Sequence, residues 1–224
     1  MTAEDGRGSD APEVMRLRVV LRDVTPTPWR RVEIAAAATL ADLHAVIQAA
    51  MGWEDLHRHR FRILGRRYDP ECADLGQIHS AGLRQRAGER FTYEYNLSVR
   101  WLHEIRVEAI GPGVAGRRYP RCPAGRHACP PEWCPGPEAL DEMRAELLGL
   151  SYAADLRLMA EFGRAVLDAR DGRVRDALDA VGVDGLRRAL ARQECREVMT
   201  APFDRRRAEA ALGRLATADK GAVP

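Results

Sequence analysis

The amino-acid sequence predicts an α+β protein in which a strand-rich first half is followed by a helix-rich tail. The first observation is the alternation of apolar and polar residues in residues 15–24, which is typical of a half-buried strand. The second is the helical spacing of apolar residues from Glu138 onward. The third is the junction between the halves, residues 119–134, which is rich in proline and cysteine and has no period. A connection of this length is unusual unless it is functional, crosslinked or disordered.

The first half begins with a predicted hairpin. In residues 15–24 the side chains of Leu17, Val19 and Leu21 point to one face, and arginines mostly point to the other. A turn that contains two prolines follows, and residues 29–34 are predicted to form the second strand.

A helix is predicted after this hairpin, because both of its ends carry recognisable signals. Thr39 and Asp42 have the spacing of a capping box, and Gly52 is a typical helix terminator. The apolar residues between these ends fall on one helical face, namely Leu40, Leu43, Val46, Ile47, Ala50 and Met51.

Three more strands are predicted before the junction, near residues 60–64, at 91–95 and at 99–110. The last of them places four side chains on one face, namely Trp101, His103, Ile105 and Val107. Residues 65–68 are interpreted as a turn, and residues 69–88 as irregular. In the tail, helical periodicity predicts helices at residues 139–148, 151–169, 174–181, 184–199 and 202–216.

The composition is that of a soluble globular protein, since 46% of the 224 residues are hydrophobic and 30% are charged. The formal net charge of +2 is too small to indicate nucleic-acid binding on its own. No apolar run approaches the roughly 20 residues that span a bilayer, and the polar N-terminus has no signal core. We therefore expect a cytoplasmic protein without a membrane partner, whose five cysteines are reduced thiols or metal ligands.

Several stretches, taken in order, resemble one known family. They are P-W-R-R (28–31), T-L-A-D-L-H-A-V-I-Q-A-A-M-G-W-E-D-L-H-R-H-R-F (39–61), F-T-Y-E-Y (91–95), W-L-H-E-I-R-V-E (101–108) and R-Y-P-R-C-P-A-G-R-H-A-C-P-P-E (118–132). Together they resemble the plasmid pRiA4b ORF-3-like family, whose members are often labelled passenger TnpR proteins of insertion elements. The resemblance covers roughly residues 15–136 and implies a small mixed or antiparallel sheet packed on one main helix. The all-α C-terminal tail follows this part and does not match the family pattern.

These interpretations divide the chain into three parts. Residues 1–13 are expected to be a disordered lead-in, residues 14–137 the family-like α+β domain, and residues 138–224 a helical C-terminal module. The chain also departs from the family pattern, because Asn96 to Arg100 replace an acidic turn and Trp133 replaces an acidic residue. Asparagine and serine cannot supply the negative charge that a hard cation needs.

The cysteine segment is a candidate zinc site. Cys122, Cys129 and Cys134 have the spacing C-x6-C-x4-C, and His127 lies inside the segment. Three thiolates and one imidazole would form a closed tetrahedral site and would order a loop that prolines interrupt. The common C-x2-C spacing is absent, however, and the alternative is that Cys122 and Cys129 are small buried apolar residues with Cys134 exposed.

Histidines and one glutamate supply further pocket candidates. His57 and His59 would share a face if both lay in a strand, and they could then bind a metal or a phosphate. His103 shares its face with Trp101 and is interpreted as a core histidine, and His44 as half-buried structure. Convergence of His57, His59, His103 and Glu104 in one polar pocket would indicate chemistry.

Arginines make nucleic acid a candidate partner. An aromatic-lined cleft would suit base stacking and phosphate contact if it lay beside Arg30, Arg31, Arg66, Arg67, Arg117 and Arg118. The alternative, which we favour, is that the four tryptophans belong to the core and the arginines are solvated.

The sequence contains no G-x-S-x-G motif, no Walker loop and no dinucleotide-binding fingerprint. The family resemblance implies a mobile-element-associated accessory protein, and the replaced acidic turn together with the absence of a complete catalytic set leads us to expect a non-catalytic binding module. One alternative is a metal-assisted nucleic-acid-processing accessory enzyme. The other is an oligomerisation or partner-binding protein that acts through its helical tail.

Overall fold

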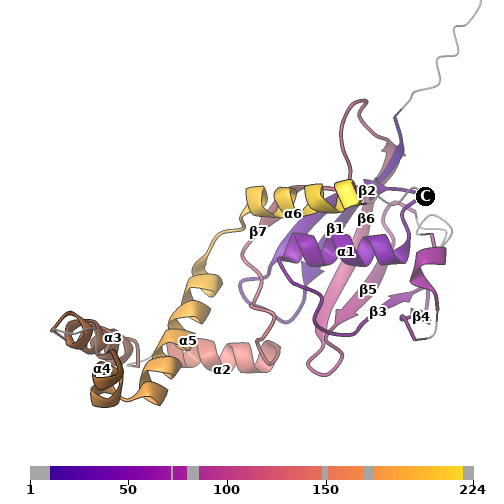
Figure 1. The fold of residues 1–224 in the computed structure, drawn as a ribbon. Helices are drawn as coiled ribbons and strands as arrows, with labels where there is room; N and C mark the ends of the chain where they lie inside the picture. The colour runs from indigo at the N-terminus through magenta and orange to yellow at the C-terminus, as the bar shows by residue number, and fades with distance from the viewer. Residues whose placement is uncertain (1–10, 72, 80–85, 148–150, 169–173, 219–224) are drawn as a thin grey trace, which may run out of the picture. The chain divides into compact units, whose positions relative to one another are not determined.

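The computed structural model describes residues 11–71, 73–79, 86–147, 151–168 and 174–218 (Figure 1). The chain divides into two compact units. The sheet unit comprises Met1–Ala128 together with Pro202–Pro224, and the helical unit comprises Cys129–Ala201.

The sheet unit is built on a seven-stranded sheet in which every neighbouring pair of strands is antiparallel. Its strand order is β4-β3-β5-β6-β1-β2-β7. The strands are β1 (Glu13–Leu21), β2 (Trp29–Ala35), β3 (His59–Ile63), β4 (Arg66–Tyr68), β5 (Arg90–Tyr95), β6 (Trp101–Pro112) and β7 (Arg121–Arg126). The predicted hairpin is confirmed, since β1 pairs with β2 from Val14↔Ala35 to Val20↔Trp29.

One face of this sheet carries the core. Leu17 of β1, Phe61 of β3, Tyr93 of β5 and Ile105 of β6 are each fully buried. The intervening positions face the other way and carry arginines and glutamates, because successive side chains of a strand alternate between its two faces. The helices cover the face of the sheet on which the alternation places the apolar side chains.

The helix α1 (Leu40–Met51) confirms the prediction made from its end signals. Thr39 and Asp42 form a complete capping box, and Gly52 ends the helix in the left-handed conformation with a φ of 86°. A short 3-10 helix, η1 (Leu75–Gln77), lies against α1 and begins at Asp74, whose side chain accepts a hydrogen bond from the amide of Gly76.

The last helix, α6 (Arg205–Ala218), returns to the sheet unit and lies beside α1 and against β7 (Figure 1). Its Leu212 is fully buried, and its Glu209 accepts a hydrogen bond of 3.0 Å from the amide of Cys122. Phe203, just before the helix, approaches β7 so closely that a Cβ on Gly125 would lie 2.6 Å from its ring. Only glycine fits at this contact.

The predicted fold class was wrong in its description of the sheet and its cover. We expected a small sheet packed on one main helix and followed by an all-α tail. The sheet has seven strands, and the helices α1 and α6 both pack in its unit, although they come from distant parts of the chain.

Two strands were missed for identifiable reasons. β4 has three residues and follows a two-residue turn in which Leu64 and Gly65 both have positive φ, as in a type I′ hairpin. β7 lies in the proline-rich junction and pairs only with β2, so it is an edge strand. Proline argues against a strand in the middle of a sheet but is tolerated in an edge strand. Because of Pro123, the sequence did not indicate a strand at β7.

The helical unit contains α2 (Pro137–Leu147), α3 (Ser151–Asp168), α4 (Val174–Val181) and α5 (Val183–Thr200). Its buried side chains include Leu140 and Leu186. Asp155 of α3 accepts two hydrogen bonds from Arg192 of α5, one of them at 2.8 Å. In the described part of the chain, every helix is too short or too polar to cross a membrane.

Candidate functional site

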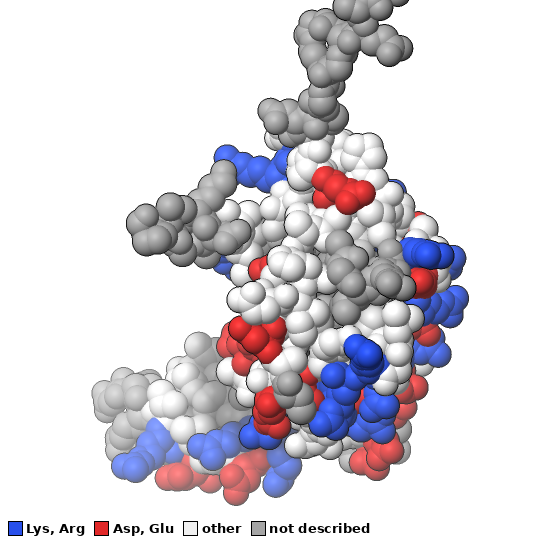
Figure 2. All heavy atoms as spheres, turned by 90° about the vertical axis from the view of Figure 1, so that its right-hand side faces the viewer, with Lys and Arg blue, Asp and Glu red and all other residues white. Residues whose placement is uncertain are grey.

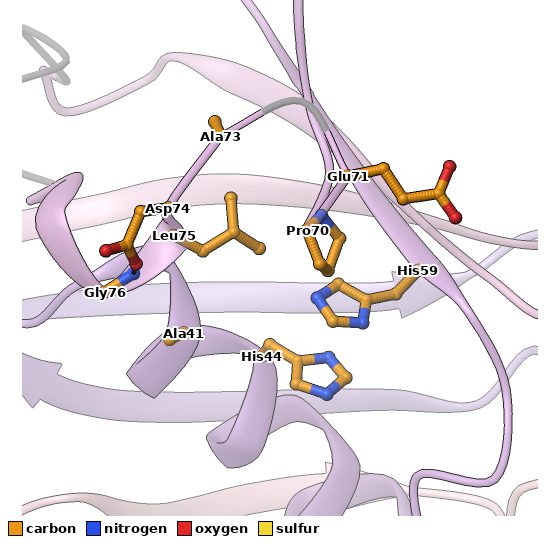
Figure 3. Close-up of a pocket in the computed structure, with 9 residues that line it drawn as sticks. All are labelled: Ala41, His44, His59, Pro70, Glu71, Ala73, Asp74, Leu75 and Gly76. Atoms are coloured by element: carbon orange, nitrogen blue, oxygen red, sulfur yellow. Dashed lines mark hydrogen bonds between the residues drawn. The ribbon is translucent and has the colours of Figure 1, made fainter.

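A pocket of about 630 Å³ opens in the sheet unit between α1, β3 and the segment that leads into η1 (Figure 3). It is lined by Ala41, His44, His59, Pro70, Glu71, Ala73, Asp74, Leu75 and Gly76. Two histidine rings therefore form part of its wall, one from the helix and one from the sheet.

His44 is placed by a polar network inside the unit. It lies on the buried side of α1, and its Nδ1 is hydrogen-bonded to the hydroxyl of Tyr93 at 2.8 Å. The same hydroxyl accepts a hydrogen bond of 2.8 Å from Nε2 of Gln48, one helical turn further along. Tyr93 belongs to β5, so this network connects the helix to the sheet and fixes the orientation of the His44 ring.

Asp55 reaches His44 from the loop after α1. Its Oδ1 lies 3.0 Å from Nε2 of His44, but the two atoms lack the alignment of a hydrogen bond. Nε2 of His44 is thus buried without a hydrogen-bond partner among the described residues. Asp55 has a φ of 59°, a conformation that non-glycine residues adopt rarely and often near functional sites.

His59 stacks on His44. The two ring centroids are 3.5 Å apart, and the ring planes are inclined by 11°. Burial of the imidazole, together with the neighbouring His44, lowers the pKa of His59 to about 4, so the ring is neutral at pH 7. Its Nε2 is buried and has no hydrogen-bond partner among the described residues.

These three side chains form a group that could hold a metal ion. One ligand atom from each of His44, Asp55 and His59 lies within 4.8 Å of the others. Two imidazoles and one carboxylate are a ligand set found in zinc and non-haem iron sites.

Buried aromatic side chains of the sheet pack against this group. Tyr93 contacts the rings of His44, His59 and His103 at centroid distances of 5.2–5.9 Å. His103 is completely buried, and this burial lowers its pKa to about 4. Its interpretation as a core histidine is confirmed.

The other predicted pocket residues lie elsewhere. His57 is half-buried before β3, where its amide donates a hydrogen bond of 3.1 Å to the hydroxyl of Tyr95, and it does not line the pocket. Trp101 is fully buried in β6. Glu104 points to the opposite face of β6 from His103 and pairs with Arg90 at 3.3 Å. Of the four residues whose convergence would indicate chemistry, the structure brings His59 to the pocket and His103 beneath it.

Sequence reasoning undervalued His44 and missed Asp55. His44 stands among the inward-facing residues of an amphipathic helix, and the chain reverses direction at Gly52. This reversal returns the W-E-D-L-H-R-H stretch toward the same helix face. A histidine on the inner helix face combined with an acid just after the helix was the available signal.

The cysteines and His127 do not belong to one unit. Cys122 and His127 lie in the sheet unit, and Cys129 and Cys134 lie in the helical unit. Cys122, Cys129 and Cys134 are all buried, so the alternative in which Cys134 is exposed was wrong on that point. Burial raises the pKa of the Cys134 thiol. The four-ligand zinc site stays a prediction.

The candidate nucleic-acid arginines are not equivalent. Arg30 is only 2% exposed, and it donates hydrogen bonds of 2.9–3.0 Å to the carbonyl oxygens of Ala50, Arg126 and His127. Its guanidinium also lies 4.1 Å from the ring centroid of Phe203. Arg30 therefore stabilises the contact between β2, α1 and β7 and does not face solvent.

The remaining candidates are spread over the sheet unit. Arg31 donates a forked pair of hydrogen bonds to Glu108, and Arg67 lies 3.1 Å from Asp69. Arg66, Arg117 and Arg118 are exposed. On the face shown in Figure 2, patches of basic atoms adjoin patches of acidic atoms.

Comparisons with known proteins agree with the fold. The model of the family described as plasmid pRiA4b ORF-3-like protein matches residues 13–155. An uncharacterized protein of Sinorhizobium fredii, y4hQ, is 33% identical over 138 residues, which cover 58% of this chain and 70% of that protein. The crystal structure of a protein of unknown function from Methanosarcina mazei, MM3350, is similar with a TM-score of 0.57 and 29% identity. The similarity covers 64% of this chain and 86% of that protein.

Proposed function

Because this chain belongs to the plasmid pRiA4b ORF-3-like family, we propose that it is a cytoplasmic accessory protein of mobile elements and acts as a non-catalytic binding module. The family description names an open reading frame of a plasmid, which supports the association with mobile elements. The passenger-TnpR label of similar sequences belongs to the same proposal. One observation carries the binding role, namely the pocket of about 630 Å³ beside His44 and His59.

The pocket lining favours a neutral or positively charged ligand. Its described lining residues include two imidazoles and two carboxylates, but neither lysine nor arginine. Glu71 pairs with Arg58 from outside the lining at 2.7 Å, and Asp74 accepts a hydrogen bond from the Gly76 amide. Phosphate sites are usually built from arginine, lysine or unsatisfied amides at a helix N-terminus. The helix α1 begins at this pocket, but Thr39 and Asp42 already cap it. A nucleic-acid ligand would therefore contact another part of the molecule.

The glutamates of β5 and β6 support binding over catalysis. Glu94 and Glu104 both point away from the pocket, on the opposite face of the sheet. Each carboxylate pairs with an arginine there, Glu94 with Arg60 and Glu104 with Arg90. Neither can reach a ligand that lies between α1 and η1.

Ligand binding to the intact chain tests this proposal. Backbone amide resonances would be followed by NMR while alkylammonium, guanidinium, neutral amide and phosphate compounds are added in turn. We expect a cationic or neutral compound to shift the amides of Ala41, Ala73 and Gly76 in a saturable manner. Ala41→Leu should weaken this binding by about tenfold or more, because a larger side chain in the first turn of α1 occupies the pocket, and a 1.4 kcal/mol loss of binding free energy is tenfold.

Ala109→Leu is the matched control, since it makes the same change at an exposed position of β6 in the same unit. It should leave binding unchanged. Saturable binding of phosphate alone, or equal binding by wild type and Ala41→Leu, would contradict the proposal.

A further inference from the structure

We propose that His44, Asp55 and His59 bind a divalent transition-metal ion beside the pocket. This inference rests on the proposed binding role of the pocket and specifies the class of cation that the pocket binds. The ligand atoms of the three side chains lie within 4.8 Å of one another, and the two imidazole rings form part of the wall of the pocket (Figure 3). Three protein ligands leave coordination positions open for water or for a small molecule.

Each of the three ligands is held by a different element. The Tyr93 hydroxyl orients His44 through Nδ1, which leaves Nε2 directed at Asp55. Hydrogen bonding of the second ring nitrogen in this way is the usual support of a metal-binding histidine. Asp55 is fixed by the left-handed turn after α1, and His59 is paired with Tyr95 in the sheet. Two of the three ligands thus stand on a helix and a strand of the same unit, the elements that hold site residues most precisely.

The contacts within this group leave buried polar atoms without an aligned hydrogen-bond partner among the described residues. Oδ1 of Asp55 and Nε2 of His44 lie 3.0 Å apart, within ion-pair distance but without the alignment of a hydrogen bond. The buried Nε2 of His59 is also without a hydrogen-bond partner among the described residues. Buried polar atoms are normally satisfied, because leaving them unpaired reduces stability. A metal ion held by the three side chains would give Nε2 of His44 and the Asp55 carboxylate a partner.

The donor atoms select the class of metal. Imidazole nitrogen suits zinc, cobalt, nickel, copper and iron, whereas magnesium and calcium prefer oxygen ligands throughout. One carboxylate and two imidazoles therefore favour a transition metal over the hard cations. The cysteine segment, in contrast, would supply mainly sulfur.

Titration of the full, chelator-treated chain with Co²⁺ and Zn²⁺ tests the site, because the absorption spectrum of bound Co²⁺ reports its ligands. We expect one tight equivalent with a visible ligand-field spectrum and without the strong thiolate-to-cobalt charge-transfer band. Asp55→Asn and His59→Gln should each weaken binding by at least about tenfold, the range seen even when a supporting group is lost. Asp55→Asn keeps the inference testable if His59→Gln fails to fold, because the Asp55 side chain is 53% exposed.

Glu13→Gln is the matched control, since it removes one carboxylate charge from an exposed position of β1 in the same unit, outside the pocket wall and the group of three ligands. It should change metal affinity less than threefold, an amount small beside the tenfold loss expected for Asp55→Asn. Unchanged binding in Asp55→Asn and His59→Gln would overturn the inference, as would a thiolate charge-transfer band for the tight equivalent. The metal titration can fail while the proposed pocket function holds. In that case an organic cation still binds the chelator-treated chain, and Ala41→Leu still weakens the binding of that cation.

Discussion

The sheet unit and the helical unit bury their large apolar residues to very different extents. In the sheet unit Leu17, Phe61 and Trp101 are all fully buried. In the helical unit Leu167 of α3 is 85% exposed and Leu190 of α5 is 46% exposed. The sheet unit therefore has a continuous core, whereas the described helices of the other unit leave much of their apolar surface in water.

In the helical unit, contacts between charged and aromatic groups join α3 to α5. Arg192 of α5 is paired with the nearly buried Asp155 of α3, and the guanidinium of Arg196 lies 3.9 Å from the centroid of the Tyr152 ring. Such contacts contribute less than the burial of a large apolar side chain. The comparison teaches that a clear helical period in the sequence predicts helices but does not show how well they pack.

The largest expected difference in stability is between Leu→Ala substitutions made in each of the two units. Leu17→Ala should reduce the free energy of unfolding of the sheet unit by about 2–5 kcal/mol, because it leaves a cavity in a closed core. Leu167→Ala should change the stability of the helical unit by less than about 0.5 kcal/mol. Hydrogen exchange measured by mass spectrometry reads each unit separately. Losses of similar size would show that the two units do not differ in packing.

Elements of the fold that depend on neighbouring residues could be predicted from the sequence, and those that depend on distant residues could not. The helix α1 was predictable because Thr39, Asp42 and Gly52 signal its ends within a dozen residues. The hairpin of β1 and β2 was equally local. The packing of α6 was not, because its buried residues Ala208 and Leu212 show that one face is covered but not by which part of the chain.

The candidate site was only partly predictable for a related reason. His59 was among the candidates, since H-R-H precedes a strand. His44 was interpreted as half-buried structure, because an inward-facing histidine on a helix is more often structural than a ligand. Asp55 was absent from the candidates, since its importance arises from the turn at Gly52 and from a left-handed backbone. Stacking of the two imidazoles depends on the tertiary packing of α1 against the sheet.

A smaller effect is expected at the ion pair of the helical unit. Asp155→Asn should cost about 1–3 kcal/mol, because it removes the negative charge that accepts both Arg192 hydrogen bonds at a buried carboxylate. The Arg192 hydrogen bonds hold the pKa of the Asp155 carboxyl below its ordinary value. Wild-type stability from this pair is therefore present above about pH 4 and is lost as the pH falls through the folded-state pKa.

Urea unfolding at a series of pH values checks this, with exchange in α3 and α5 as the local readout. The difference between wild type and Asp155→Asn should shrink as the pH falls below about 4. A difference that stays constant from pH 7 to pH 3 would show that the pair adds no linked stability.

The smallest effect is expected at the matched pair on the outer face of the sheet. Glu108 accepts a forked pair of hydrogen bonds from Arg31, as Asp155 does from Arg192, but both side chains are partly exposed, at 21% and 35%. Solvent screens such a pair, so Glu108→Gln should cost no more than about 1 kcal/mol. The pKa of Glu108 is lowered by the Arg31 hydrogen bond, so this contribution too is lost as the pH falls through that pKa.

Arg31→Lys is the informative companion to Glu108→Gln, because lysine keeps the positive charge and loses the planar fork. Similar losses in both variants, read from exchange in β2 and β6, would assign the contribution to the forked geometry. A loss at Glu108 that exceeds the loss at Asp155 would reverse the expected order of the two units. The outer face of the sheet would then add more stability than expected beyond its apolar core, and burial would no longer explain the order of the two ion pairs.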